Sequence, residues 1–147
     1  MNRPIYILNG PNLSHLGTRE PDIYGTTTLA EIESMCRAVD LGVAIEFRQT
    51  NSETQLIEWV HEAIDSASGI IINPAAFSFT SLALLDALKM FPGPIIEVHL
   101  SNIHKREPLY HRSLASLAAT AVIAGLGADG YPTAVGAIVK LLLRHAS

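Results

Sequence analysis

The sequence predicts a single α/β domain built on a five-stranded parallel sheet, and three observations support that prediction. A chain of 147 residues has room for one well-buried core and hardly for two. Apolar residues make up 48% of the chain, as in compact, heavily buried domains. Short apolar runs alternate with stretches of helical periodicity, which is typical of a parallel sheet that is covered on both faces.

The first strand and the first helix are separated by a long polar loop. Residues 4–8 form a short β-rich run that stops at an Asn-Gly pair. Thr28 precedes apolar residues at helical spacing, and Glu31 completes a capping box with it. These signals predict a strand over residues 4–8 and a helix over residues 29–39, with Thr28 as its N-cap.

The same alternation continues to the end of the chain. Four further short apolar runs are typical of strands, and they span residues 43–47, 69–72, 95–99 and 120–124. Between and after them, apolar residues share one helix face over residues 52–64, 80–90 and 131–144. At this length, the simplest arrangement is one flavodoxin-like, doubly wound domain over residues 1–147, with strand order 2-1-3-4-5.

Charge and cysteine content exclude several classes of function. Ten basic and fourteen acidic residues give a formal charge of −4 without a basic cluster, so nucleic acid is not an expected partner. With a single cysteine, Cys36, the chain cannot form an internal disulfide or a cysteine-based zinc site. Cys36 falls on the apolar face of a predicted helix, so we expect it in the core. No apolar stretch is long enough for a membrane span or a signal peptide, so a cytoplasmic protein is expected.

Polar side chains follow the strands where a ligand would bind in such a sheet. Asn12 follows the first strand, Asn73 follows the third, and His99 ends the fourth. Ligands of doubly wound sheets bind at the carboxyl ends of the strands, where the strand order reverses. We therefore expect Asn12, Asn73 and His99 to lie close together.

The loop over residues 12–28 is long for a compact domain, which favours a functional lid with glycine hinges. It carries Arg19 and Tyr24. A guanidinium beside the phenol would stabilise the ionised form and make Tyr24 a general base. The alternative interpretation is a surface tyrosine packed on Pro21, and the spacing leaves both open.

Glu97 and His99 are two residues apart on a predicted strand, so their side chains share one face. A carboxylate beside an imidazole fixes its tautomer and favours its protonated form, which suits a general acid. A structural histidine at a strand end is the open alternative. The backbone N–H groups after His99, together with Arg106, suit a carboxylate ligand.

Other patterns predict no site. The run Gly125–Gly130 matches G-x-G-x-x-G, but no further strand follows it, so a tight turn explains it better than a dinucleotide site. The histidines lack zinc-ligand spacing, and no metal site is expected. Lys89 and Lys105 lack the apolar setting that favours imine chemistry.

Five motifs occur in order along the chain: LNGPNL, LGTREPDIYG, QTNSETQLIEWVHEA, EVHLSNIHKRE and GLGADGY. With them, residues 5–137 resemble the type II 3-dehydroquinate dehydratases. The resemblance implies a flavodoxin-like fold, a homododecamer of four trimers, and no metal or organic cofactor. It also implies trans elimination of water from 3-dehydroquinate through an enolate to 3-dehydroshikimate, in the shikimate pathway to aromatic amino acids or in quinate catabolism.

The resemblance assigns catalytic roles position by position. Tyr24 matches the proton-abstracting base, and Arg19 matches its activating partner on the lid. Asn12 matches the residue that stabilises the enolate oxygen through a water. His99, supported by Glu97, matches the general acid that protonates the departing hydroxyl.

The resemblance also assigns substrate contacts. Asn73 matches one of them, and the backbone of Leu100 and Ser101 matches the group that holds the substrate carboxylate. Arg106 matches an arginine of the active-site loop. Asp86 matches an aspartate that acts across the trimer contact, which implies a site that depends on oligomerisation.

Four positions depart from the family pattern. Phe79 replaces a substrate-binding histidine, and Tyr110 replaces an arginine that contacts a ring hydroxyl. Leu85 replaces another arginine, and Ser14 replaces Asn or Gly. Each lost hydrogen bond to a substrate hydroxyl costs about 1–3 kcal/mol. Three hypotheses follow: a dehydroquinate dehydratase with an altered pocket, a related lyase acting on a less hydroxylated cyclic keto acid, and a catalytically silent ligand-binding oligomer.

Overall fold

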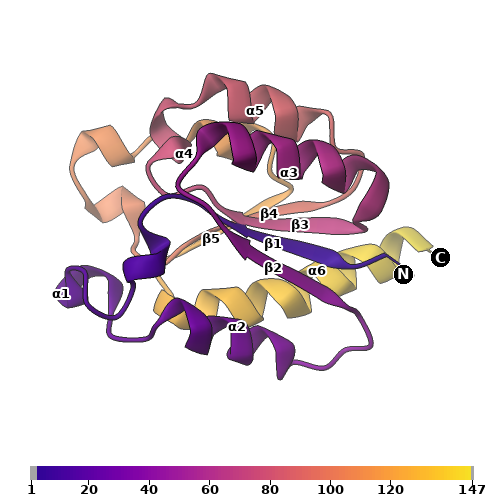
Figure 1. Ribbon diagram of the computed structural model, residues 1–147, viewed down its shortest axis with the longest axis horizontal. Helices are drawn as coiled ribbons and strands as arrows, with labels where there is room; N and C mark the ends of the chain where they lie inside the picture. The colour runs from indigo at the N-terminus through magenta and orange to yellow at the C-terminus, as the bar shows by residue number, and fades with distance from the viewer. Residues whose placement is uncertain (1–2, 147) are drawn as a thin grey trace.

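The computed structural model describes residues 3–146 and contains the predicted sheet (Figure 1). Five parallel strands lie in the order β2-β1-β3-β4-β5. They are β1 (Ile5–Asn9), β2 (Ile45–Gln49), β3 (Gly69–Asn73), β4 (Ile95–His99) and β5 (Ala121–Ala124). The predicted fold class and strand order are therefore confirmed.

Four helices cover the two faces of the sheet (Figure 1). α2 (Leu29–Arg37) and α6 (Gly130–Ala146) lie on one face, and α3 (Glu53–Ser66) and α5 (Leu82–Lys89) lie on the other. Because successive strand residues point to opposite faces, each strand contributes to both cores. Ile7 and Ile71 face α2 and α6, whereas Leu8 and Ile72 face α3 and α5.

Two predicted elements differ from the structure. β2 runs two residues later than expected, because its ladder pairs Ile45 with Ile5 and continues to the pair of Gln49 and Asn9. As an edge strand that is only half-buried, β2 accommodates polar residues that a central strand would not. The helix predicted over residues 80–90 begins two residues later, as α5, because the Ser81 side chain caps it by accepting from the N–H of Leu84. The short helix α4 (Phe77–Thr80) precedes it and was not predicted.

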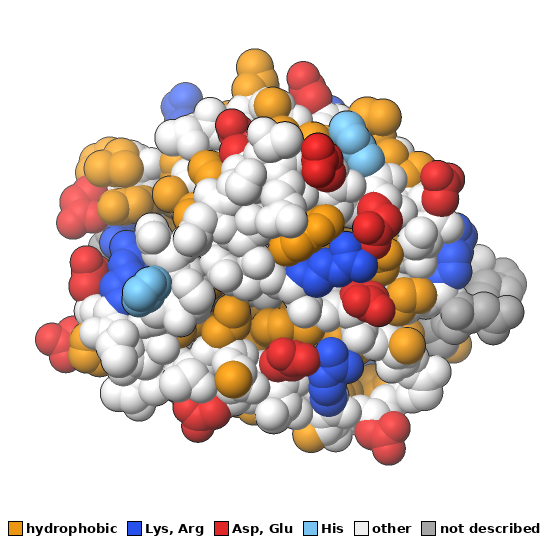
Figure 2. Space-filling model, viewed as in Figure 1, with side chains coloured by type: hydrophobic (Ala, Val, Ile, Leu, Met, Phe, Trp, Pro, Cys, Tyr) orange, Lys and Arg blue, Asp and Glu red, His pale blue; other side chains and the backbone are white. Residues whose placement is uncertain are grey.

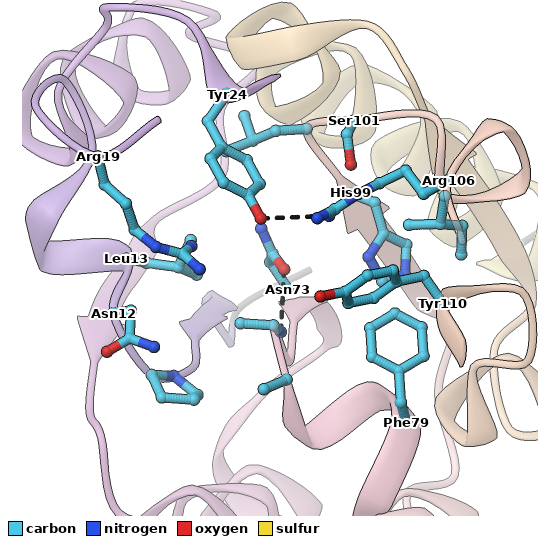
Figure 3. A pocket seen from close by; sticks show the side chains of 15 residues that line it. Asn12, Leu13, Arg19, Tyr24, Asn73, Phe79, His99, Ser101, Arg106 and Tyr110 are labelled. Atoms are coloured by element: carbon cyan, nitrogen blue, oxygen red, sulfur yellow. Dashed lines mark hydrogen bonds between the residues drawn. The ribbon is translucent and has the colours of Figure 1, made fainter. Parts of the chain in front are cut away.

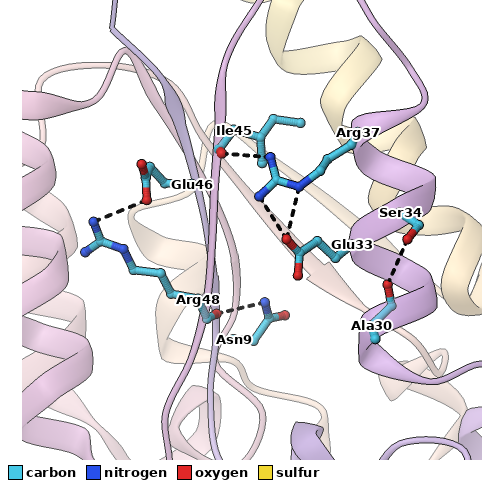
Figure 4. Close-up of polar contacts among 8 residues, drawn as sticks. All are labelled: Asn9, Ala30, Glu33, Ser34, Arg37, Ile45, Glu46 and Arg48. Atoms are coloured by element: carbon cyan, nitrogen blue, oxygen red, sulfur yellow. Dashed lines mark hydrogen bonds and ion pairs between the residues drawn. The ribbon is translucent and has the colours of Figure 1, made fainter.

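Polar contacts hold the edge strand in place (Figure 4). Arg37 Nη1 donates to the carbonyl of Ile45 at 3.1 Å, and Arg37 Nη2 pairs with Glu33 at 2.8 Å. Asn9 Nδ2 donates to the carbonyl of Arg48 at 3.0 Å. These bonds tie β2 to α2 and β1 where apolar cover is thin.

The segment over residues 12–28 is more regular than a loop. It contains the 3-10 turn η1 (Leu13–His15) and the short helix α1 (Pro21–Tyr24), whose first position is a proline. Leu13 and Leu16 are buried against the core, whereas Ile23 near the tip is 43% exposed. The segment is thus anchored at its start and exposed at its tip.

Short 3-10 turns make up much of the chain between β4 and α6. Four 3-10 turns connect β4, β5 and α6: η2 (Ile103–Lys105), η3 (Pro108–Tyr110), η4 (Leu114–Leu117) and η5 (Gly127–Asp129).

Cys36 is buried as predicted, and burial raises the pKa of its thiol to about 12. On the face shown in Figure 2, basic side chains are interspersed with acidic ones. Across residues 3–146, no helix combines the length and apolarity needed to cross a bilayer.

Candidate active site

A pocket of about 110 Å³ opens at the carboxyl ends of β1, β3 and β4 (Figure 3). It contains every predicted site residue except Glu97 and Asp86. The lining residues are Asn12, Arg19, Tyr24, Asn73, Phe79, His99, Leu100, Ser101, Arg106 and Tyr110, with Pro11, Leu13, Ala75, Ala76 and Ile103. The expected convergence of Asn12, Asn73 and His99 is confirmed.

The loops after β1 and β3 touch at Gly10. Its N–H donates to the carbonyl of Asn73 at 2.9 Å. A Cβ atom on Gly10 would lie 2.4 Å from the carbonyl oxygen of Pro74, so only glycine fits at this contact. The close approach brings the segment that carries Asn12 beside Asn73.

The backbone of Asn12 is fixed by polar residues at and just beyond the end of β2. Asn12 has a left-handed conformation, with φ 69°, which asparagine tolerates better than most residues. Its N–H donates to Asn51 Oδ1 at 3.0 Å, and the same oxygen accepts from Gln49 Nε2 at 3.1 Å. Gln49 and Asn51 thereby support the site from behind Asn12.

Two guanidinium groups flank the phenol of Tyr24 (Figure 3). Arg106 Nη1 donates to the Tyr24 hydroxyl at 3.2 Å, and Arg19 Cζ lies 4.8 Å from the ring centroid. Tyr24 is half-buried and lines the pocket rather than the open surface. The sequence placed Arg19 beside the phenol, but the hydrogen bond comes from Arg106, which is 82 residues away along the chain.

Glu97 and His99 form a buried pair, as their spacing predicted. The Nε2–H group of His99 donates to Glu97 Oε2, which leaves Nδ1 for the pocket. Ser113 Oγ donates to Glu97 Oε2 and Ser116 Oγ donates to Glu97 Oε1, each at 2.5 Å. Burial acts to raise the pKa of Glu97, but His99 and the two hydroxyls outweigh it and hold that pKa below its ordinary value. Glu97 is therefore an anion at neutral pH.

Phe79 and Tyr110 form an aromatic wall on one side of the pocket. The Phe79 ring stacks on His99, with centroids 6.2 Å apart, and meets Tyr110 edge-on at 5.3 Å. Arg106 Cζ lies 4.0 Å from the centroid of Tyr110. His111, the basic residue that directly follows Tyr110, lies outside the pocket. Its Nε2–H donates to the Arg106 carbonyl at 2.6 Å. The side chain of Phe79 offers no hydrogen bond to a substrate hydroxyl.

The sequence did not predict the buried network behind Asn73. Tyr131, which is fully buried, donates to Asn9 Oδ1 at 2.7 Å and accepts from Asn73 Nδ2 at 3.0 Å. Asn73 Oδ1 accepts from the N–H of Ala75 at 3.1 Å, and Ala75 has φ 52°. A tyrosine on an otherwise apolar helix face was the available signal, because its hydroxyl needs a buried partner.

We expect Tyr131→Phe to lower the free energy of unfolding by about 1–3 kcal/mol. The change leaves the buried polar atoms of Asn9 and Asn73 without their partner. Urea denaturation measures the effect, and Tyr110→Phe, in the half-open pocket, is the matched control. An unfolding midpoint equal to that of the control would show that the network adds no stability.

One predicted site residue, Asp86, lies apart from the pocket. Asp86 is exposed on α5 and does not line the pocket of its own chain, while its neighbour Leu85 is buried. Nowhere in residues 3–146 do three or more His, Cys, Asp or Glu side chains form a group that could hold a metal ion.

Comparison with known proteins gives a consistent result. The family model for dehydroquinase class II matches residues 3–139. The 3-dehydroquinate dehydratase of Bartonella henselae is 57% identical over 99% of each chain. The 3-dehydroquinate dehydratase 2 of Agrobacterium fabrum is 53% identical over 95% of this chain and 97% of its own. The crystal structure of the type II dehydroquinase from Propionibacterium acnes is 44% identical, covering 95% of this chain and 98% of that chain, with a TM-score of 0.87.

Proposed function

The chain belongs to the dehydroquinase class II family, and from this premise we propose that it eliminates water from 3-dehydroquinate to give 3-dehydroshikimate. One observation carries the assignment of the chemistry to this pocket. A phenol flanked by two guanidinium groups lies in the same pocket as an imidazole backed by a buried carboxylate. Eliminating water from a hydroxy ketone needs a base for the α-proton and an acid for the leaving hydroxyl, and no group is oxidised.

In the first step, the Tyr24 phenolate takes the α-proton from the substrate. Arg106 donates to the phenol oxygen and Arg19 lies over the ring, so both stabilise the negative charge of the phenolate. The electrons of the broken C–H bond move to the ketone oxygen and form an enolate. Asn12, through a water molecule, stabilises the charge on that oxygen.

In the second step, His99 gives a proton from Nδ1 to the departing hydroxyl. Glu97 accepts a hydrogen bond from Nε2, which orients the ring and stabilises the imidazolium before transfer. The enolate collapses as the C–O bond breaks, and water leaves with the conjugated enone as product. Base and acid thus come from separate segments, the lid and the end of β4.

Binding uses the strand ends. The backbone N–H groups of Leu100 and Ser101 hold the substrate carboxylate, at the position where β4 ends. Asn73 keeps one amide N–H for the substrate, because Tyr131 accepts only the other. The substrate is therefore held at its carboxylate while its ring extends toward His99 and the aromatic wall.

The direct test follows the absorbance of the conjugated enone. Purified protein is mixed with 3-dehydroquinate and, separately, with analogues that lack one ring hydroxyl. Turnover of 3-dehydroquinate at the higher kcat/KM supports the proposal. Turnover of the analogues alone would reject it in favour of the second candidate, a lyase for a less hydroxylated cyclic keto acid.

The aromatic wall is the observation that favours this second candidate. Phe79 contributes only apolar surface, so it places no hydrogen-bonding group against the substrate ring. The third hypothesis, a silent oligomer, gives no reason for the Tyr24–Arg106 contact to share one pocket with a His99 ring that is held by Glu97 from behind.

We expect the double variant Phe79→His with Tyr110→Arg to raise kcat/KM for 3-dehydroquinate. Two restored hydrogen bonds to ring hydroxyls correspond to roughly tenfold or more. The two single variants are the first controls. The second control is the substrate analogues that lack a ring hydroxyl, for which the double variant should show no increase in kcat/KM. A folded double variant without a gain on 3-dehydroquinate would mean that the wall does not limit selectivity.

The family resemblance also leads us to propose a homododecamer of four trimers that works in the cytoplasm. The resemblance assigns Asp86 to the trimer contact, and its exposed position on α5, outside the pocket of its own chain, leaves it accessible to a neighbouring subunit. Sedimentation velocity measures the assembly. A stable monomer with full activity would reject both the assembly and the role of Asp86.

A further inference from the structure

Ser113 and Ser116 lie behind the pocket, on the segment that returns to the sheet before β5. Ser113 precedes η4 and Ser116 lies within it, three residues later, which places both on one side of a 3-10 turn. Ala115 between them is buried and packs in the core on the α3 and α5 face. The turn is therefore anchored, and both hydroxyls donate to Glu97.

Glu97 needs these donors because it is fully buried in the middle of the sheet. Its strand neighbours are Ile72 on β3 and Val122 on β5, and neither side chain can make a hydrogen bond. An unpaired carboxylate in such a place is costly and tends to take up a proton. Ser116 serves Oε1, while Ser113 shares Oε2 with His99, so each oxygen has a hydroxyl donor.

We infer that Ser113 and Ser116 are positioning residues for the proposed acid step, because they keep Glu97 anionic and so keep the His99 imidazole oriented with Nε2–H toward Glu97 and Nδ1 toward the pocket. The inference rests on the role of His99 proposed above. If Glu97 took up a proton, its O–H would donate to Nε2, and the neutral imidazole would be left with a weakly acidic Nδ1–H. The hydroxyls disfavour that arrangement, since they stabilise the anion.

Few other groups influence this pair. Within residues 3–146, His99 is the titratable side chain that contacts Glu97, and η4 presents only hydroxyls to it. Arg106 and Tyr24 line the opposite, pocket side of His99. The pKa of Glu97 is held below its ordinary value. Glu97 therefore remains an anion at pH values where an ordinary glutamate is protonated, and it takes up a proton only as the pH falls through its lowered pKa. Removing the hydroxyls moves this protonation to higher pH.

The test compares Ser113→Ala, Ser116→Ala and the double variant with the wild-type chain. The double variant should lose roughly tenfold in kcat at neutral pH, with little change in KM. The acidic limb of its kcat profile should move to higher pH. Ser116→Thr, made with Ser113 left intact, keeps both hydroxyls and should retain the wild-type kcat profile. Ser34→Ala is the control, because Ser34 is exposed on α2 and donates only to the Ala30 carbonyl.

NMR titration of the His99 ring provides a readout that does not depend on turnover. The double variant should shift the His99 titration relative to wild type, and Ser34→Ala should not. An unchanged titration and an unchanged acidic limb in a folded double variant would overturn the inference. If wild-type protein leaves 3-dehydroquinate unconverted, the proposed function fails, and the titration alone decides whether the serines control the pair.

Discussion

Replacing Tyr24 with phenylalanine is expected to lower kcat for 3-dehydroquinate by about 10²–10⁴-fold, which is the contribution of a positioned general base. The variant keeps the ring that lies near Arg19 and loses only the oxygen to which Arg106 donates. KM should change little, because the phenol acts on the reacting carbon rather than on the substrate carboxylate. Steady-state kinetics on the folded variant measures both values.

The control for this experiment is Tyr6→Phe. Tyr6 is buried on the other face of the sheet, where its hydroxyl donates to Glu62 at 2.5 Å. That variant removes a tyrosine hydroxyl of the same chain but should retain the wild-type kcat. If Tyr24→Phe also kept kcat within about twofold of wild type, Tyr24 would not be the base.

Replacing His99 with asparagine is expected to lower kcat for elimination by a similar factor of about 10²–10⁴. Its effect differs from that of Tyr24→Phe, because the reaction passes through an enolate. Without the acid, Tyr24 still removes the α-proton and the enolate returns to substrate. In heavy water, the variant should therefore exchange deuterium into the substrate faster than it forms product.

Proton NMR of the recovered substrate follows this exchange while the enone absorbance follows elimination. Tyr24→Phe should lose both exchange and elimination, and it is the matched control for His99→Asn. Loss of exchange and elimination to the same extent in His99→Asn would contradict separate acid and base. The same variant also leaves the buried Glu97 carboxylate without the hydrogen bond from its His99 partner, so we expect a lower free energy of unfolding.

Much of the fold follows from local signals in the sequence. The apolar runs over residues 69–72 and 95–99 are fully buried central strands, and a parallel sheet leaves few alternatives for them. The boundaries of β2 were less predictable, because an edge strand follows its ladder with β1 rather than its own apolar run. The short helix α1 was missed, since four residues are too few to show periodicity.

The site was predictable where topology decides it. Asn73 and His99 end strands that meet at one edge, so their convergence follows from the strand order. The contact of Arg106 with Tyr24 joins residues from two irregular segments, and no pattern in either segment specifies their distance. Ser113 and Ser116 went unnoticed for the same reason, because the segment that carries them has no helical or strand period.

The most direct measurement is a crystal structure with a planar mimic of the enolate bound. The proposed chemistry predicts the Tyr24 oxygen within about 3.5 Å of the carbon that would lose its proton. It also predicts His99 Nδ1 facing the leaving-group position, with the carboxylate of the mimic on the N–H groups of Leu100 and Ser101. A mimic held elsewhere, or a phenol turned out of the closed pocket, would contradict the assignment of Tyr24 and His99 as base and acid.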